Sequence, residues 1–424
     1  MSKTEWKECT LGDLIRIKHG YAFKGDYITT NDNGVVLVTP GNFAIGGGFQ
    51  ERKCKFFSSD YPNDYVLKAG DLIVTMTDLS KDGDTLGYSA KVPSSENRVY
   101  LHNQRIGLIE LKNKNVDPNF LYWVMRSPSY QKGIVATASG STVKHTSPGR
   151  ICESKILLPP LAEQQRIAKI LSSLDDKIEL NNAINRNLEE QAQAIFKSWF
   201  VDFEPFAKEP FIDAPNEQRI PISLKMVQVN DLPHLLETGR RPKGGAVKEG
   251  IPSIGAENVK QLGVFDYSSD KFIPREFAES LGKGKINGYE LLLYKDGGKP
   301  GTFIPHFSMF GEGYPYEECY INEHVFKLDF GDKGLNIFAY FYFQTDYVVS
   351  WLANNGGKAA IPGINQNDVN AIWIYDLSHP KVQEFGDIAK PMFEQILKNC
   401  KQNHQLSILR DSLLSKLMSG ELDR

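Results

Sequence analysis

The stretch from residue 161 to residue 200 reads LAEQQRIAKILSSLDDKIELNNAINRNLEEQAQAIFKSWF and contains neither glycine nor proline. It follows Pro159 and Pro160, and proline suits the start of a helix. Seam residues recur at alternating spacings of four and three, which is typical of a coiled coil. This seam consists of Ile167, Leu171, Leu174, Ile178, Asn181, Asn185, Leu188, Ala192, Ile195 and Trp199. The pattern predicts one helix of about 60 Å, at about 1.5 Å per residue.

A second seam near the C-terminus has the same spacing. Adding 218 to the first seam from Leu174 onward gives Met392, Ile396, Asn399, Asn403, Leu406, Arg410, Leu413 and Leu417. Both asparagines recur, and only Ala192 becomes polar, as Arg410. We predict an antiparallel helix pair with Asn181 beside Asn403 and Asn185 beside Asn399, because a buried amide pair satisfies itself and penalises a shifted register. The alternative is that the helices bend here and the asparagines face water.

The two helices belong to a weak repeat that runs through the whole chain at an offset near 218. Each match is weak alone, but the matches occur in the same order at nearly constant spacing. The matched segments are 11–14 with 229–232, 34–38 with 250–254, 70–74 with 288–292, 103–106 with 322–325 and 120–123 with 338–341. We therefore predict two copies of one unit, each a mixed module followed by a long helix.

Each module combines short strand-like runs with turns rich in glycine, proline and asparagine, and with an aromatic-rich helical segment. We predict an α+β fold in which two similar mixed α/β modules are joined by two long antiparallel coiled-coil helices. The arrangement is expected to be pseudo-two-fold and circular, with the termini close together. The predicted segments are a first module at 1–157, a first helix at 158–204, a second module at 205–378 and a second helix at 379–424.

The composition is that of an ordinary globular protein of 424 residues, 41% hydrophobic and 24% charged. No apolar run approaches the roughly 20 residues of a membrane helix, and the first residues lack the apolar segment of a secretion signal. The five cysteines are scattered, which argues against a disulfide framework or a zinc site and favours a reduced, cytoplasmic protein. The net charge is −3, so any contact with nucleic acid must be local.

Sequence motifs for catalysis and cofactor binding are missing. We find no Walker-type phosphate loop, no nucleophile elbow and no histidine spacing typical of a metal site, so we expect no catalytic residue, metal or cofactor in this chain. The glycine-rich run 282–288 (GKGKING) superficially resembles a dinucleotide-binding loop. Its spacing is wrong and no strand–helix context surrounds it, so we interpret it as a surface turn.

Three turns in each module combine cations with glycine, at matching places of the two copies. The matched pairs are 19–25 with 238–245, 77–83 with 294–301 and 139–145 with 355–358. Glycine lets the backbone approach a phosphate closely, and arginine can also grip a guanine edge. We predict DNA contacts from Lys24, Lys81, Lys144, His145, Arg240, Arg241, Lys243, Lys295, Lys299 and Lys358. The alternative is that these are solvated turns without a partner.

Several segments resemble the specificity subunit of type I restriction–modification systems. Residues 158–167 (LPPLAEQQRI) resemble the entry to the first conserved helix of that family, and residues 197–205 (KSWFVDFEP) resemble its exit. Residues 415–422 (SKLMSGEL) resemble the end of its second helix, and residues 11–14 and 70–73 fit its target-recognition domains. The second helix departs from the family at residues 378–380, where Ser-His-Pro replaces the Pro-Pro-Leu entry.

The resemblance implies a non-catalytic DNA reader. Each module would be a target-recognition domain that reads one part of a bipartite double-stranded target, and the helices would set the spacing. Two methyltransferase subunits would dock along the helices, with Gln164, Gln165, Trp199 and Phe200 as docking residues. These subunits would bring S-adenosylmethionine, and restriction subunits that use ATP and magnesium would join them. The alternatives are a protein-binding scaffold and a stand-alone DNA-modifying enzyme.

Overall fold

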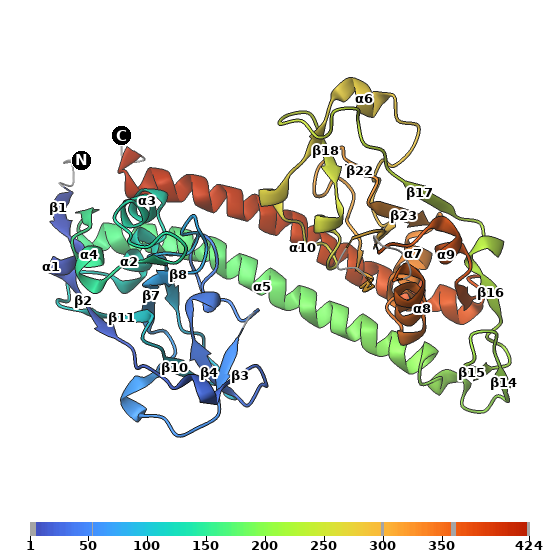
Figure 1. Ribbon diagram of the computed structural model, residues 1–424, viewed down its shortest axis with the longest axis horizontal. Coiled ribbons are helices and arrows are strands. Elements are labelled where there is room, and N and C mark those ends of the chain that lie inside the picture. Colours follow the sequence, from blue (N-terminus) through green and yellow to red (C-terminus); the bar gives the residue numbers. More distant parts are fainter. Residues whose placement is uncertain (1–5, 53, 298–300, 358–361, 422–424) are drawn as a thin grey trace. The chain divides into compact units, whose positions relative to one another are not determined.

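The computed structural model describes residues 6–52, 54–297, 301–357 and 362–421. The chain forms two compact units: unit 1 comprises residues 1–176 and 406–424, and unit 2 comprises residues 177–405. Two long helices, α5 (Leu161–Phe200) and α10 (Pro380–Met418), each contribute one section to unit 1 and one to unit 2 (Figure 1). Within the described ranges, no helix combines the length and the apolar character that a membrane span requires.

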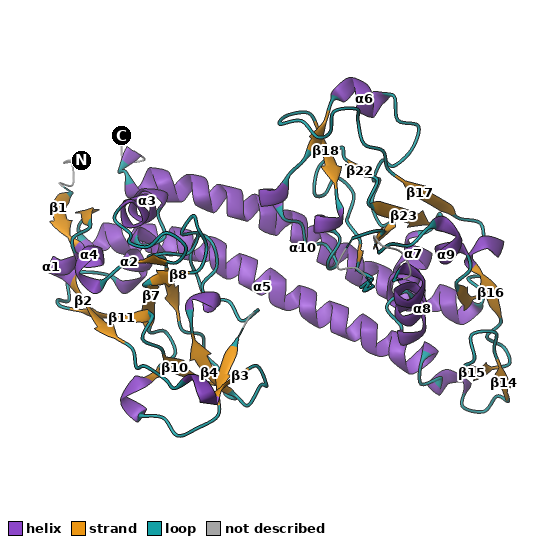
Figure 2. Cartoon of the chain, in the orientation of Figure 1, coloured by secondary structure: helices purple, strands orange, loops and turns teal. Residues whose placement is uncertain are grey.

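Unit 1 holds the first α/β module. A four-stranded sheet has the order β2-β11-β7-β9 and a five-stranded sheet has the order β3-β5-β4-β10-β6; β1 pairs with β13 and β8 pairs with β12 (Figure 2). Its strands are β1 (Lys7–Thr10), β2 (Ile15–His19), β3 (Ile28–Thr29), β4 (Val35–Val38), β5 (Lys55–Phe57), β6 (Val66–Leu67), β7 (Leu72–Thr75), β8 (Thr77–Asp78), β9 (Ser89–Lys91), β10 (Val99–His102), β11 (Ile106–Leu111), β12 (Lys144–His145) and β13 (Lys155–Leu158). Its short helices are α1 (Leu11–Leu14), α2 (Pro118–Val124), α3 (Pro128–Ala136) and α4 (Pro148–Cys152).

Unit 2 holds the second module. A four-stranded sheet has the order β17-β23-β20-β21 and a three-stranded sheet has the order β19-β18-β22; β16 pairs with β24 and β14 pairs with β15. Its strands are β14 (Phe211–Asp213), β15 (Arg219–Pro221), β16 (Met226–Gln228), β17 (Leu235–Thr238), β18 (Ile251–Ile254), β19 (Phe272–Ile273), β20 (Leu291–Tyr294), β21 (Phe307–Ser308), β22 (Tyr320–Ile321), β23 (Val325–Asp329) and β24 (Trp373–Tyr375). Its short helices are α6 (Arg275–Glu279), α7 (Lys333–Tyr342), α8 (Asp346–Gly356) and α9 (Gln366–Asn370).

The sheets of the two modules share a common central topology, although the sheet with the parallel pair has five strands in unit 1 and three in unit 2. The antiparallel pair β2·β11 recurs as β17·β23, and the parallel pair β4·β10 recurs as β18·β22. In the register of the strands, Leu108 lies opposite Lys18, and Lys327 lies opposite Glu237 in the same place of the other sheet. Leu108 and Lys327 are 219 residues apart, and so are Lys18 and Glu237. The equivalent strands of the four-stranded sheets are therefore related by an offset of 219, one residue more than the offset of the helical seams. The internal repeat is therefore present in the fold as well as in the sequence.

One sequence match is wrong by one residue. The repeat in the sequence pairs Gly70 with Gly288, but Ile73 lies opposite Leu108 and Leu292 lies opposite the equivalent Lys327, so the strand register matches Gly70 with Tyr289. Both of these residues have positive φ, 84° for Gly70 and 70° for Tyr289. Because glycine is the usual residue in this conformation, the sequence favoured the neighbouring glycine over the tyrosine.

Each module builds its core against its own section of the two long helices. In unit 2, Phe196 and Phe200 of α5 pack with Phe338 of α7 and Phe385 of α10, at ring-centroid separations of 5.0 to 6.1 Å. Buried aromatic rings of this size dominate the energetics of a core. In unit 1, the helix sections contribute a smaller aliphatic set that packs with α2: Ile167, Ala168, Leu171, Leu414 and Leu417.

Two asparagine pairs lie where α5 and α10 pack together in unit 2. Asn181 Nδ2 donates to Asn403 Oδ1 at 2.8 Å, and Asn399 Nδ2 donates to Asn185 Oδ1 at 2.8 Å. The Asn181 amide also donates to Gln402 Oε1 at 2.8 Å, and the residue is fully buried. The helices are therefore antiparallel in this unit, and the asparagines pair in the predicted register instead of facing water.

The ends of the described chain lie together in unit 1 (Figure 1). A Cβ atom added to Gly420, just after α10, would lie 3.8 Å from the Trp6 ring, just before β1. Trp6 packs against the same core as Leu414 and Leu417 of α10. The C-terminal helix thus completes the core of the module that begins the chain.

Arg410, the polar residue in the second seam, belongs to an ion network in unit 1. Asp175 of α5 accepts from Arg410 Nη1 and from Arg126 Nη1, each at 2.6 Å. The Arg126 side chain is 5% exposed, and it lies 4.4 Å from the Trp123 ring centroid. Its Nε donates to Gly46 O at 2.8 Å. One carboxylate therefore ties α5, α10 and the first module together.

The corresponding positions of unit 2 carry apolar residues. Ala192 stands at the place of Arg410, and Phe393 stands at the place of Asp175. Both are fully buried in the core of unit 2. The same step of the helical seam is therefore ionic in one unit and apolar in the other.

Replacing Asp175 with alanine is expected to reduce the free energy of unfolding of unit 1 by about 3–5 kcal/mol, because Arg126 keeps a buried charge without its partner. Asp176→Ala, at the exposed neighbouring position, is the control and should stay within about 0.5 kcal/mol. Hydrogen exchange of the α2 amides, next to Arg126, measures both changes. Equal effects in the two variants would contradict a structural role for the network.

Candidate nucleic-acid interface

The second and third cationic turns of the first module are held together by a short ladder. β8 pairs with β12, so Lys144 lies opposite Asp78 and His145 lies opposite Thr77. Thr77 Oγ1 and His145 Nδ1 are 3.2 Å apart. The turn that carries Lys81 and the turn that carries Lys144 therefore form one surface, although they are more than 60 residues apart in sequence.

The turn with Lys81 is organised by a carboxylate. Asp78 accepts hydrogen bonds from Ser80 N at 2.6 Å and from Thr85 Oγ1 at 2.6 Å. Burial favours the neutral carboxyl, but the hydrogen bonds from Thr85 and Ser80 outweigh it and hold the pKa of Asp78 below its usual value. Asp78 is thus a buried carboxylate that shapes the turn, while Lys81 at its tip is exposed.

The second module repeats this pairing of turns, although the segment that pairs with the second cationic turn is 362–364 and not the segment 355–358 that the repeat matched. Asp296 pairs with Gly363, and Ile364 N donates to Lys295 O at 2.8 Å. Lys295 is only partly available, because its Nζ donates to the Glu323 carbonyl oxygen at 2.9 Å and its side chain is 26% exposed. Two other predicted cations of these turns, Lys299 and Lys358, lie outside the described residues.

The first cationic turn of each module begins with a glycine that a larger residue could not replace. A Cβ atom on Gly20 would lie 2.1 Å from Asn103 O, and a Cβ atom on Gly239 would lie 1.8 Å from Ile321 O. In both modules an asparagine shapes the adjacent turn, since Asn103 Oδ1 accepts from Arg105 N at 3.1 Å and Asn322 Oδ1 accepts from His324 N at 2.9 Å. The close approach of these backbones places the two turns side by side.

Backbone hydrogen bonds join this asparagine turn to the paired turns as well. In unit 1, Met76 N donates to Arg105 O at 3.0 Å, and Gln104 N donates to Tyr21 O at 2.9 Å. In unit 2, Lys295 N donates to His324 O at 3.0 Å. Each module therefore gathers four turns: 20–27, 78–85, 103–105 and 139–145 in unit 1, and 239–245, 295–297, 322–324 and 362–364 in unit 2.

The side chains that these turns present differ between the modules. In unit 1, Lys24 is exposed and Tyr21 is 43% exposed, with the Tyr21 ring 5.2 Å from the Tyr65 ring. Gln104 and Arg105 are also exposed. Tyrosine, glutamine and arginine can all meet a base or a phosphate, so this surface combines stacking with hydrogen bonding.

Unit 2 presents mainly arginine and lysine in the first turn. Arg240, Arg241 and Lys243 are exposed, and Arg241 Nη1 lies 3.8 Å from Glu323 Oε1. Next to them, His324 Nδ1 bonds to Asp296, and its Nε2 lies 3.4 Å from the same Glu323 carboxylate. This surface alternates cations with carboxylates, which can accept from cytosine amino groups.

Four residues of these surfaces were missed by the sequence analysis: Gln104, Arg105, Glu323 and His324. Their signal was present, because the segments 103–106 and 322–325 match each other in the repeat. The match by itself indicates only duplication, since a single chain does not reveal that the asparagine turn lies beside the cationic turns.

Two of the predicted docking residues are buried in their own units. Gln164 is 1% exposed; its Oε1 accepts from Asp117 N at 2.8 Å and its Nε2 donates to Pro159 O at 2.8 Å. Phe200 is 3% exposed within the aromatic core of unit 2. The prediction that these two side chains face a partner is corrected: they stabilise the fold. Gln165 is exposed, and Trp199 is half-buried with Lys381 Nζ 4.5 Å from its ring.

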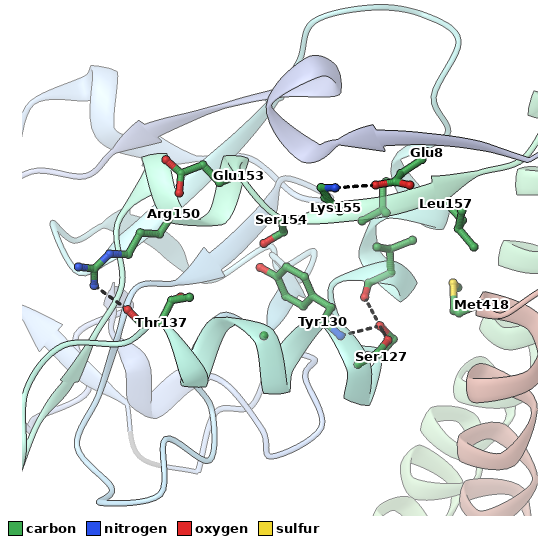
Figure 3. A pocket seen from close by; sticks show the side chains of 14 residues that line it. Glu8, Ser127, Tyr130, Thr137, Arg150, Glu153, Ser154, Lys155, Leu157 and Met418 are labelled. Carbon is green, nitrogen blue, oxygen red and sulfur yellow. Dashed lines mark hydrogen bonds and ion pairs between the residues drawn. The ribbon is translucent and has the colours of Figure 1, made fainter.

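A pocket in unit 1 lies on other elements of the first module. It is lined by α3, α4 and β13, with Met418 of α10 at one side (Figure 3). Lys155 Nζ and Glu8 Oε1 form an ion pair at 2.9 Å on its wall, and Arg150 Nη1 donates to Thr137 O at 2.8 Å. The described residues contain no group of three or more histidine, cysteine or acidic side chains placed to hold a metal.

Comparison with known proteins finds similarity to specificity subunits. Residues 3–190 match the family model described as the type I restriction modification DNA specificity domain. The chain is 28% identical over 307 residues to the type I restriction enzyme MjaIX specificity subunit of Methanocaldococcus jannaschii, which covers 72% of this chain and 68% of that protein. It is 31% identical over 214 residues to the HindI specificity subunit of Haemophilus influenzae, covering 48% of this chain and 42% of that one.

A solved structure shares the fold. The crystal structure of the type I restriction–modification S subunit from M. genitalium aligns with a TM-score of 0.59 and 15% identity, over 99% of this chain and 97% of that one. Two α/β modules joined by long helices are therefore the fold of both proteins. The chain is therefore similar, in the sequence of residues 3–190 and in its fold, to the specificity subunits of type I restriction–modification systems.

Proposed function

We propose that this chain is the DNA sequence-recognition subunit of a type I restriction–modification enzyme, in which each module reads one part of a bipartite double-stranded target. The observation that carries the proposal is the recurrence of the same four gathered turns in both units. The shared backbone supports a common task, and the different side chains, Tyr21 and Gln104 against Arg241 and Glu323, support different base preferences. Such a protein would recognise an asymmetric target.

In this proposal α5 and α10 set the distance between the two parts of the target and bind two methyltransferase subunits. The amide pairs between the helices support a fixed length, because they define one register. Gln165 and Trp199 are the side chains of the predicted docking set that remain accessible. The partner subunits would supply S-adenosylmethionine, and restriction subunits would supply ATP- and magnesium-dependent cleavage, in the cytoplasm.

The proposal is tested by methylation with and without this chain. Methyltransferase subunits with the full chain should methylate adenines only at one bipartite sequence, which mapping of methylated adenines in the source strain would identify. Omission of the chain should abolish the modification. Methylation of the same sites without the chain would contradict the proposed function.

Replacing Arg240 or Arg241 with alanine is expected to weaken recognition of one half of the target. If the arginine grips a guanine, the loss is about 1–3 kcal/mol on the cognate sequence and smaller on one with that base changed. Arg219→Ala is the matched control, because Arg219 is an exposed arginine on β15, outside the gathered turns. Fluorescence anisotropy with duplexes altered at single positions measures the change. An equal loss on every duplex would identify a phosphate contact instead.

Lengthening both helices should lengthen the target. Four residues inserted after Asn182 in α5 and four after Lys401 in α10 add about 6 Å, at about 1.5 Å per residue. With base steps of about 3.4 Å, the spacer between the two half-sites should grow by one or two base pairs. The same insertion after Glu217, in the turn between β14 and β15, is the control and should leave the spacer unchanged. A methylation map that shows an unchanged spacer in the helix variant would contradict the proposal that α5 and α10 set the distance between the half-sites.

A further inference from the structure

The run 282–288, predicted to be a surface turn, lies directly against the Arg240–Arg241 turn. A Cβ atom on Gly284 would lie 3.5 Å from the Gly239 Cα, so the two backbones are in contact. Gly284 O also accepts from Ile321 N at 2.8 Å, beside the asparagine turn of unit 2. Run 282–288 is therefore a fifth segment of the gathered turns, and no sequence motif indicated this.

This run carries two lysines without a carboxylate partner. Lys285 is exposed and Lys283 is partly exposed, and neither belongs to an ion pair among the described residues. Lys271 of unit 2, by contrast, is paired with Glu257 at 2.5 Å. Unpaired cations on a glycine-rich backbone that lies beside exposed arginines form a surface suited to a polyanion.

Buried charges hold the run in place. Lys327, whose side chain is 4% exposed, lies 3.0 Å from Glu237 Oε2 and donates to Lys285 O at 2.7 Å. The same Glu237 oxygen accepts from Gly284 N at 2.9 Å. At the other end of the run, Glu290, 2% exposed, accepts from Gly288 N at 2.7 Å. Two buried charged side chains, Lys327 and Glu290, and the partly buried Glu237 thus fix the backbone of one surface turn.

The first module lacks the Lys327–Glu237 part of this network, although Asp71, at the place of Glu290, accepts from Lys68 N at 2.8 Å. Leu108 stands at the place of Lys327, and Lys18 stands at the place of Glu237. Lys18 Nζ donates to Asp64 O at 3.1 Å and lies 5.1 Å from the Tyr65 ring centroid. The corresponding segment of unit 1, around Asp64 and Tyr65, is therefore bound by a lysine on the outside of the sheet. Burying an ion costs several kcal/mol before its pairing is counted. The fold itself does not require an ion at this place, because unit 1 has Leu108 there. The buried charges of unit 2 therefore serve the run that they hold.

We propose that residues 282–288 form an additional DNA-contacting turn of the second module, in which Lys283 and Lys285 bind backbone phosphates and Lys327 is a positioning residue that fixes the turn against Arg240 and Arg241. The inference rests on the proposed function and deepens it. Phosphate contacts carry no base information but fix the orientation of a protein on the duplex. The lysines would thus hold the module so that the arginines reach the base edges.

The lysines are tested by the variant Lys283→Ala/Lys285→Ala in the full chain, assembled with methyltransferase subunits. Dissociation constants are measured at several salt concentrations, on a duplex with the mapped target and on a scrambled duplex. Two lost phosphate contacts should make the slope of log K against log salt shallower by about 2 on both duplexes, at about 0.9 per contact, with the ratio between the duplexes preserved. The matched control is Lys208→Ala/Lys225→Ala, two exposed lysines of unit 2 outside the gathered turns, which should keep the wild-type slope.

The outcomes separate this inference from the function on which it rests. Wild-type binding that prefers the target, together with an unchanged slope in the lysine variant, would overturn the inference alone. A loss confined to the target duplex would overturn the phosphate assignment, because it would mark base contacts. A wild-type complex that binds no better than the methyltransferase subunits alone would overturn the proposed function, and this inference with it.

The positioning role of Lys327 is tested by the neutral set Lys327→Leu/Glu237→Gln/Glu290→Gln, which leaves no unpaired buried charge. With the fold retained by circular dichroism, the salt slope should become shallower by about 2, and adding the lysine changes should produce no further change. A wild-type slope in this folded variant would overturn the role. Hydrogen exchange on the wild-type chain tests the positioning role without a variant that could misfold. The Gly284 and Gly288 amides should exchange far more slowly than the Gly244 amide. Equal exchange rates would overturn the positioning role.

Discussion

The fold depends on the pairing of two asparagine amides between α5 and α10. Asn181 is fully buried and bonds to Asn403, so a shift of one helix along the other would leave a polar group without a partner in the interior. The core of each unit contains side chains from both helices, and the register therefore decides which residues face each module. A leucine seam alone would hold the helices together without specifying where along their length they meet.

The sequence contained the large features of the fold because they are periodic. The seam spacing predicts helices at 158–204 and 379–424, and the structure has them at Leu161–Phe200 and Pro380–Met418. The repeat likewise predicts two modules of similar topology. Details set by tertiary contact were not accessible: Tyr289 adopts the positive φ that Gly70 adopts, and Gln164 turns inward to bond with Pro159 and Asp117. Residue type alone favours a glycine at the position that Tyr289 occupies, and it favours an exposed side chain for Gln164.

The candidate interface was predictable in part for the same reason. Cations beside glycine mark Arg240, Arg241 and Lys81 as exposed turn residues, and they are exposed. The grouping of the turns depends on hydrogen bonds between distant backbones, such as that from Met76 to Arg105, which no local pattern records. Run 282–288 fits no cofactor motif, and its place beside Gly239 depends on a tertiary contact that the sequence does not record.

Equivalent positions of the two long helices are ionic in unit 1 and apolar in unit 2, so the two helix sections are not chemically interchangeable. Arg126 of the first module meets Asp175 and Arg410, whereas the equivalent helix positions beneath the second module are Phe393 and Ala192. A first module transplanted onto the second helix section would bury its guanidinium against a phenyl ring. An exchange of modules between the two halves would therefore have to carry module and helix section together.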